Sequence, residues 1–246
     1  MKKKVLKIFL LLLVIVLVLV VFKNEIFILI EDVSNSFYRT VIEEQRYELL
    51  FEGFLSTTII SIMSIILGTL MGIVIYYLRK CHYEIIKKIS RYFVSIIQGV
   101  PITVLLLTFY YVIFGKVNIE PMLVAIITFS IYFSAYVSEI FRGAMDSINV
   151  SQIHSAYALG FNKYQTLKYI ILPQALTYTI PVYKNEIVSL IKLTSIAGYI
   201  SIMDLTKASD IIRNRTYEAF FPLIITAIVY FILCFLIGKI LDLIYK

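Results

Sequence analysis

The sequence predicts an all-α integral membrane protein with about six transmembrane helices. Hydrophobic residues make up 60% of the chain and charged residues only 16%, and the mean hydropathy is +0.89. These values are typical of a protein solvated by lipid, in which a spanning helix needs about 20 mostly apolar residues. The formal net charge of +7 comes from short basic clusters beside apolar runs. Such clusters orient membrane proteins, so the charge does not indicate nucleic-acid binding.

The first apolar run, residues 8–22, follows four lysines and has two interpretations. It ends at Lys23 and Asn24 without a small-x-small cleavage pattern, which favours an uncleaved membrane helix over a cleaved signal peptide. Residues 23–53 then carry seven acidic and three basic side chains, a balance that suits the outer face of the membrane. We therefore expect residues 1–53 to form a membrane helix, a possible signal anchor, followed by an acidic extracytoplasmic connector.

Residues 54–246 are expected to form the main transmembrane domain. Its apolar runs cover residues 54–78, 92–114, 121–141, 173–202 and 218–241. The loop at 79–91 carries five basic side chains against Glu84, and this excess places the loop in the cytoplasm. Residues 204–218 are then expected to be a short outer loop. Both termini would lie in the cytoplasm.

Three local patterns predict how these spans pack. Gly68 and Gly72 form a G-x3-G pair, which lets two membrane helices approach closely. Gly99 and Pro101 are expected to bend the span at 92–114, either as a packing kink or as part of a gate. Near the cytoplasmic edge, an ion pair is predicted between residues three positions apart on one helix face. Its members are Glu139 and Arg142.

A polar segment, residues 151–181, separates two apolar regions and organises the chain. Ser151 is expected to cap a first helix, and Gly160 stands where that helix should end in a left-handed residue. Four positions fall on one face of this helix: Gln152, Ser155, Ala156 and Leu159.

A second helix is expected to follow the glycine. Asn162 and Gln165 form a capping-box pattern at its start. Pro173 is expected to end it, because proline disfavours α geometry in the residue before it.

This segment resembles the cytoplasmic coupling loop of ATP-binding-cassette (ABC) transporter permeases of the polar amino-acid uptake family. The family pattern is approximately GQ-x-EAA-x-ALG followed by I-LPQA-x4-P-x3-N. The matching positions are Gln152, Ala156, Ala158, Leu159, Gly160, Leu172, Pro173, Gln174, Ala175, Pro181 and Asn185. Ser151, His154 and Ser155 depart from the pattern, and His154 replaces a glutamate whose charge an imidazole does not supply at neutral pH. The run AY-x2-EIFRGA at 135–144 also matches the family.

The resemblance covers roughly residue 50 to the end. It implies a type I ABC importer permease fold with a cytoplasmic coupling loop at 143–172. The positions expected to couple to an ATPase are Gln152, His154, Ser155, Ala156, Ala158, Leu159 and Gly160. The positions expected to be structural are Gly99, Pro101, Glu139, Arg142, Pro173 and Pro181.

The span at 173–202 is unusually polar. Charged side chains are costly in lipid, so those of this span should face the bundle interior or a water-filled path. The candidates for a substrate path are Asn185, Glu186, Lys192, Thr194 and Ser195. An internal ion pair between Glu186 and a lysine, which would only hold helices together, is the alternative. The family's usual aspartate after Lys192 is Leu193 here.

The resemblance further implies an importer of several subunits in the cytoplasmic membrane. Two permease chains, identical or different, would pair around the path, a separate ATPase dimer would dock below, and an extracytoplasmic binding protein would deliver a polar amino acid. The chain has no G-x4-GK[ST] phosphate loop. ATP and magnesium are therefore expected on the ATPase, and no cofactor on this chain. Closure of the ATPases would move the loop and so switch the side of the membrane to which the path between the spans is open.

Two other classes of protein fit the sequence less well. A secondary transporter or channel without an ATPase would show inverted repeats or a selectivity ring, and neither is apparent. An intramembrane enzyme would need a catalytic motif around its titratable residues. His82 and His154 are the only histidines, and no H-E-x2-H or G-x-S-x-G pattern accompanies them.

Overall fold

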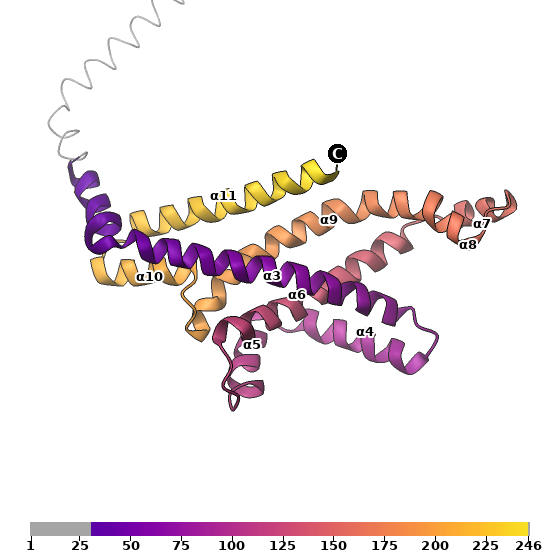
Figure 1. The fold of residues 1–246 in the computed structure, drawn as a ribbon, viewed down its shortest axis with the longest axis horizontal. Helices are drawn as coiled ribbons and strands as arrows, with labels where there is room; N and C mark the ends of the chain where they lie inside the picture. The colour runs from indigo at the N-terminus through magenta and orange to yellow at the C-terminus, as the bar shows by residue number, and fades with distance from the viewer. Residues whose placement is uncertain (1–30, 246) are drawn as a thin grey trace, which may run out of the picture.

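The computed structural model describes residues 31–245, and every regular element among them is helical. Four long helices, α3, α6, α9 and α11, run broadly along the long axis of the molecule (Figure 1). The elements after the helical residues 31–37 are η1 Tyr38–Ile42, η2 Glu43–Gln45, α3 Tyr47–Arg79, α4 Glu84–Gly99, α5 Ile102–Leu107, η3 Thr108–Ile113, α6 Pro121–Asp146, α7 Val150–Ala158, α8 Lys163–Thr166, η4 Leu167–Ile171, α9 Leu172–Leu193, η5 Thr194–Ile200, α10 Leu205–Thr216 and α11 Phe220–Tyr245.

Length and composition identify three helices that can cross a membrane by themselves, α3, α6 and α11. Two bent pairs raise the number to five if each pair is one span: Glu84–Gly99 with Ile102–Ile113, and Lys163–Ile200 with Leu205–Thr216. With both pairs counted, the number equals that of the five expected runs of the main domain. The sixth predicted span, residues 8–22, lies outside the described residues.

The core is built on the contact between α3 and α6. Phe129 and Phe133 of α6 are fully buried, and two glycines of α3 allow the helices to meet without an intervening side chain. A Cβ atom at Gly68 would lie 2.8 Å from the carbonyl oxygen of Ser130, and one at Gly72 would lie 2.6 Å from the Cβ of Val137. The predicted close packing at the G-x3-G pair is thereby confirmed.

The span expected at 92–114 is broken and not merely bent. Helix α4 ends at Gly99, α5 begins at Ile102, and the two axes differ by 107°. Val100 and Pro101 have extended backbone conformations, and for Val100 this is the conformation that a following proline favours. Pro101 then lies just before the first turn of α5, where its missing N–H costs no hydrogen bond.

Two further expectations are wrong. Residues 205–216 form the helix α10, although 204–218 was expected to be a loop. The side chain of Asp204 accepts hydrogen bonds from the backbone N–H groups of Thr206 and Lys207, both at 3.2 Å, and so caps this helix. Pro173 does not end a helix either, because the chain continues through it into α9.

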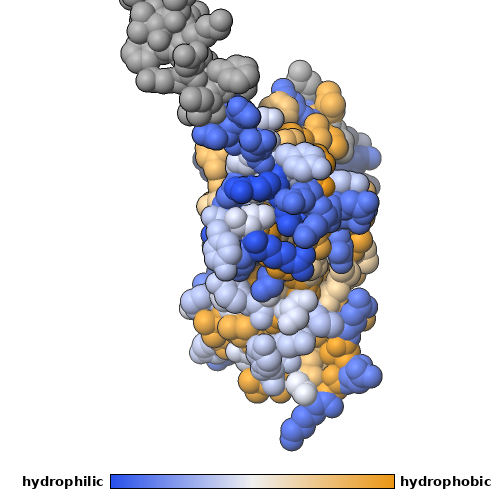
Figure 2. Space-filling model, turned by 90° about the vertical axis from the view of Figure 1, so that its left-hand side faces the viewer, coloured by the Kyte–Doolittle hydropathy of each residue, from blue (hydrophilic) through white to orange (hydrophobic). Residues whose placement is uncertain are grey.

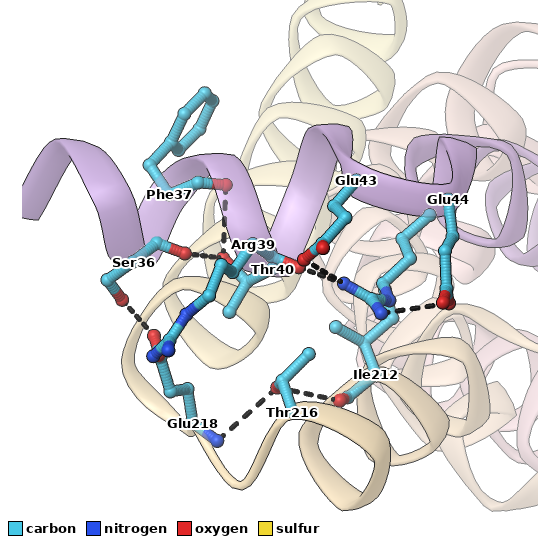
Figure 3. A network of polar contacts seen from close by, with 10 residues as sticks. Ser36, Phe37, Arg39, Thr40, Glu43, Glu44, Ile212, Thr216 and Glu218 are labelled. Atoms are coloured by element: carbon cyan, nitrogen blue, oxygen red, sulfur yellow. Dashed lines mark hydrogen bonds and ion pairs between the residues drawn. The ribbon is translucent and has the colours of Figure 1, made fainter.

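The end of the molecule that carries the connector has a largely hydrophilic surface (Figure 2). Figure 2 looks onto this end and shows polar residues gathered over it, with apolar residues along the flanks. The connector is joined to the turn between α10 and α11 by Glu218, which accepts hydrogen bonds from Ser36 and Arg39 (Figure 3). Arg46 in turn donates to the carbonyl oxygen of Arg39 and pairs with Glu44 at 2.8 Å. The connector is therefore ordered by side-chain contacts.

Candidate functional site: the α7–α8 loop and the helix that carries it

The loop between α6 and α9 contains two short helices at the far end of the molecule from the connector (Figure 1), here called the loop end. Helix α7 begins after Asn149, whose side-chain oxygen accepts a hydrogen bond of 2.9 Å from the backbone N–H of Ser151. The expected cap at Ser151 is wrong by two residues. Its hydroxyl instead donates to the same Asn149 oxygen at 2.6 Å, because Ser151 already lies inside the first turn.

Gly160 ends α7 as predicted, with a φ angle of +85°. The N–H of Gly160 donates to the carbonyl of Tyr157 and that of Phe161 to the carbonyl of Ala156, both at 3.0 Å. This pair of bonds is the Schellman arrangement, which requires a left-handed residue. The capping box at α8 is also confirmed. Asn162 and Gln165 exchange two side-chain-to-backbone bonds of 2.9 Å.

One of the predicted coupling positions, Ala156, does not lie on the exposed face of the loop. Ala156 is only 1% exposed and is thus covered by its own chain, whereas Leu159 is 78% exposed. A side chain buried in its own chain cannot enter a groove of another protein. Most other predicted coupling positions are exposed: Gln152, His154, Ser155, Ala158 and Gly160. Gln152 also accepts a bond of 2.8 Å from the side chain of Gln174 in α9, which ties α7 to the long helix.

The loop is continuous with the fifth expected span. Residues Lys163–Ile200 form one helical body that starts in the loop and runs along the molecule. The π-turn η4 lies directly before Pro173. A wider turn moves the preceding carbonyls away from the proline ring, so the helix passes through a residue that would otherwise stop it. Pro181 likewise lies inside α9. A displacement of the loop would therefore act directly on this span.

A cavity of about 560 Å³ lies between α4, α6 and α9. Glu186 lines it from α9, and Gln98, at the end of α4, lines it beside the break at Gly99. Tyr136 and Glu139 of α6 contribute further polar atoms. Among residues 31–245, Glu186 has no ion-pair partner within 4 Å. A half-buried carboxylate at a cavity wall favours cationic groups.

The other predicted path residues do not join Glu186 in this cavity. Lys192 lines a separate, mostly apolar cavity of about 470 Å³ against α11, and Ser195 lines a smaller one beside Asp204. Thr194 is fully buried and donates to the carbonyl of Ile191 at 2.7 Å. Asn185 is exposed.

The structure does not contain the alternative, an ion pair between Glu186 and a lysine among residues 31–245. The lysine two residues earlier, Lys184, pairs with Asp242 of α11, with both oxygen distances at 2.7 Å.

The predicted pair of Glu139 and Arg142 is part of a larger cluster. Arg142 contacts Glu139 through Nε at 2.8 Å and contacts Asp146 at the same distance. Arg79, at the end of α3, reaches the other oxygen of Glu139 at 2.7 Å. This role of Arg79 was not predicted from the sequence, where Arg79 counted only as one of the charges that orient the loop at 79–91.

Comparison with known proteins identifies the family. The model of the binding-protein-dependent transport system inner membrane component matches residues 64–246. A putative glutamine transport system permease protein of Rickettsia typhi is 33% identical over 201 residues, which cover 80% of this chain and 91% of the relative. A probable amino-acid ABC transporter permease protein of Bacillus subtilis is 31% identical, with coverage of 80% and 88%.

A solved structure of an amino acid ABC transporter has a TM-score of 0.73 and 30% identity, and the match covers 80% of this chain and 93% of that one. An inward-facing structure of the MetNI methionine ABC transporter, at 18% identity, has a TM-score of 0.65 and supports the fold alone. The fold is therefore that of the permease of a type I ABC importer, and the protein crosses the membrane several times. With most of its length matched, the chain belongs to the family of binding-protein-dependent transport system inner membrane components.

Proposed function

We propose that this chain moves a polar amino acid across the cytoplasmic membrane, driven by a separate ATPase that docks on the α7–α8 loop. The observation that carries the proposal is the rigid connection between that loop and the polar cavity. Helix α7 is fixed at both ends by its caps, and Lys163–Ile200 forms one body that reaches from the loop to Glu186. A close-packed helix transmits a displacement with little loss.

The exposed surface of the loop supports docking. Leu159 is exposed at the tip of the loop. Burial of this large apolar side chain under a partner protein would stabilise a complex. Tyr157 and Val150 are also exposed, at 44% and 60%. ATP and magnesium would bind to the ATPase dimer, and this chain would supply no cofactor site. Alternating access would follow from movement of the two permease chains about the shared path.

The amino-acid substrate is inferred from the relatives and from the cavity. The named relatives are described as a putative glutamine transport system permease and a probable amino-acid ABC transporter permease. A further one, from Bacillus subtilis, is described as an L-cystine transport system permease and is 30% identical. Every amino acid carries an α-ammonium group, which the carboxylate of Glu186 can pair with. An extracytoplasmic binding protein would deliver the substrate to the connector end.

Reconstitution tests the proposal. Proteoliposomes that hold the chain, its ATPase and its binding protein should accumulate labelled glutamine or cystine only when ATP is enclosed on the side of the ATPase. Vesicles lacking the ATPase are the control, and they should show no accumulation. Uptake of equal rate without the ATPase would instead identify a secondary transporter or channel.

A further inference from the structure

A second cavity, which the transport proposal does not use, lies where the loop-end tips of α3, α4 and α6 meet. Its volume is about 380 Å³, and Tyr76 and Asp146 form part of its wall. The remaining wall consists of five cationic side chains: Arg79, Lys80, Lys87, Arg91 and Arg142. Because these side chains converge from separate helices, the cavity concentrates positive charge in one place.

The neighbouring carboxylates are too few to neutralise these cations. Three carboxylates pair with them: Glu84, Glu139 and Asp146. The pairs involve Arg79 at 2.7 Å, Lys87 at 3.0 Å and Arg142 at 2.8 Å. Lys80 and Arg91 form no ion pair with any of residues 31–245. The cavity therefore keeps a surplus of two positive charges.

A hydrogen-bond donor in the cavity is also left over. The ammonium group of Lys80 lies 4.9 Å from the centre of the Tyr76 ring, a contact that leaves its N–H groups free for an oxygen ligand. Together with the surplus of positive charge, this donor indicates an anionic acceptor.

The surroundings of the cavity indicate where that acceptor comes from. Three strongly exposed tyrosines lie on the elements that form the cavity: Tyr77 on α3, Tyr83 on the turn before α4 and Tyr92 on α4, at 67%, 71% and 68%. Tyrosine is enriched at the level of the lipid head groups, where its ring meets hydrocarbon and its hydroxyl meets water. The fixed anions at this level are the phosphates of the lipid.

We propose that this cavity binds the phosphate group of an anionic phospholipid. Arg91 and Lys80 supply the unpaired charge, and Lys87 adds a donor from the same helix as Arg91. Lysine and arginine form charge-assisted hydrogen bonds to phosphate oxygens. Free phosphate ions share this chemistry, so the experiment must separate the two sources.

The test is native mass spectrometry of the purified chain after exchange into detergent with phosphatidylglycerol or phosphatidylcholine. The wild type should retain phosphatidylglycerol in preference to phosphatidylcholine. The double variant Lys87→Gln/Arg91→Gln should bind it on the order of twentyfold more weakly, since each basic residue near an anionic surface contributes about fivefold. Lys88→Gln is the matched control, because Lys88 is exposed on the same helix but does not line the cavity.

Three results would overturn the proposal. One is equal retention of the two lipids by the wild type. Another is an equal loss in Lys88→Gln and in the double variant. The third is displacement of phosphatidylglycerol by millimolar inorganic phosphate, which would identify a free ion as the occupant. Because lipid binding is measured directly, failure here would leave the transport proposal untouched.

Discussion

Arg79, the last residue of α3, and Glu139 of α6 are 60 residues apart in the chain and form an ion pair of 2.7 Å. The same carboxylate holds Arg142. Glu139 thus joins the tip of α3 to the last turn of α6, just before the loop begins. The side chain of Arg79 is only 12% exposed, so the pair lies largely out of water.

Removal of this carboxylate charge should destabilise the fold. Glu139→Gln should lower the free energy of unfolding by about 2 kcal/mol, because it leaves the buried guanidinium of Arg79 without its anion. Asp146→Asn, at a side chain that is 55% exposed in the same cluster, should cost about 0.5 kcal/mol. Denaturant titration in detergent measures both. If the two variants lose the same free energy of unfolding, the Arg79–Glu139 ion pair contributes no more than an exposed ion pair.

The glycines of α3 and α6 offer a second comparison. Gly72→Ala would place a methyl group 2.6 Å from the Cβ of Val137 and should cost about 1–3 kcal/mol, because α3 and α6 must move apart. Gly143→Ala meets nothing within 4 Å, and alanine favours a helix over glycine by about 1 kcal/mol. Thermal unfolding midpoints should therefore shift in opposite directions. A stable Gly72→Ala variant would contradict the close packing.

These contacts show which features could be predicted from the sequence. The Gly160 stop and the Asn162–Gln165 capping box are local, because each depends on residues at most five positions apart, and both were predicted. The partnership of Arg79 with Glu139 depends on how two helices pack, and no spacing in the sequence encodes it. The inward position of Ala156 was missed for the same reason, since helical periodicity defines faces but not what covers them.

Helix α10 was missed for another reason. Its charges, Asp210 and Arg213 among them, pair at helical spacing with a distance of 3.0 Å, but a polar segment between two apolar runs was interpreted as a loop. The cap at Asp204 and the pairing three residues apart were available signals. The break at Pro101 was predicted as a bend, because proline position indicates where a helix changes direction but not by how much.

The connector contact should depend on pH. Hydrogen bonds from Ser36 and then from Arg39 lower the pKa of Glu218 below its usual 4.5 (Figure 3). A lowered carboxyl pKa in the folded state means that the contact stabilises the fold at pH values above 4.5 and that this contribution is lost as the pH falls below it. The hydrogen-exchange protection factors of residues 36–46, which correct for the intrinsic pH dependence of exchange, should fall over that range in the wild type.

Glu218→Gln is the control for this dependence. The protection factors of its connector should be lower than those of the wild type at neutral pH and should change little on acidification. If the variant and the wild type show the same pH profile, a group other than Glu218 controls the connector.

Glu186 should influence substrate affinity. Glu186→Gln removes the charge that faces the 560 Å³ cavity while keeping the size of the side chain. The amino-acid concentration for half-maximal uptake should rise about tenfold or more, as expected for a lost hydrogen bond to a charged group. Glu120→Gln, at an exposed position before α6, should leave uptake unchanged. Unchanged uptake in Glu186→Gln would place the substrate path elsewhere.

The most direct test of ATPase coupling is uptake by Leu159 variants in proteoliposomes with the ATPase and the binding protein. Burial of one leucine contributes about 2 kcal/mol, and Leu159→Asp would also place a charge in the interface. We predict at least a tenfold loss of both ATPase docking and ATP-driven uptake, because about 1.4 kcal/mol corresponds to tenfold in affinity. Leu159→Met should retain both activities. Normal docking and uptake in Leu159→Asp would show that the ATPase does not bind this loop.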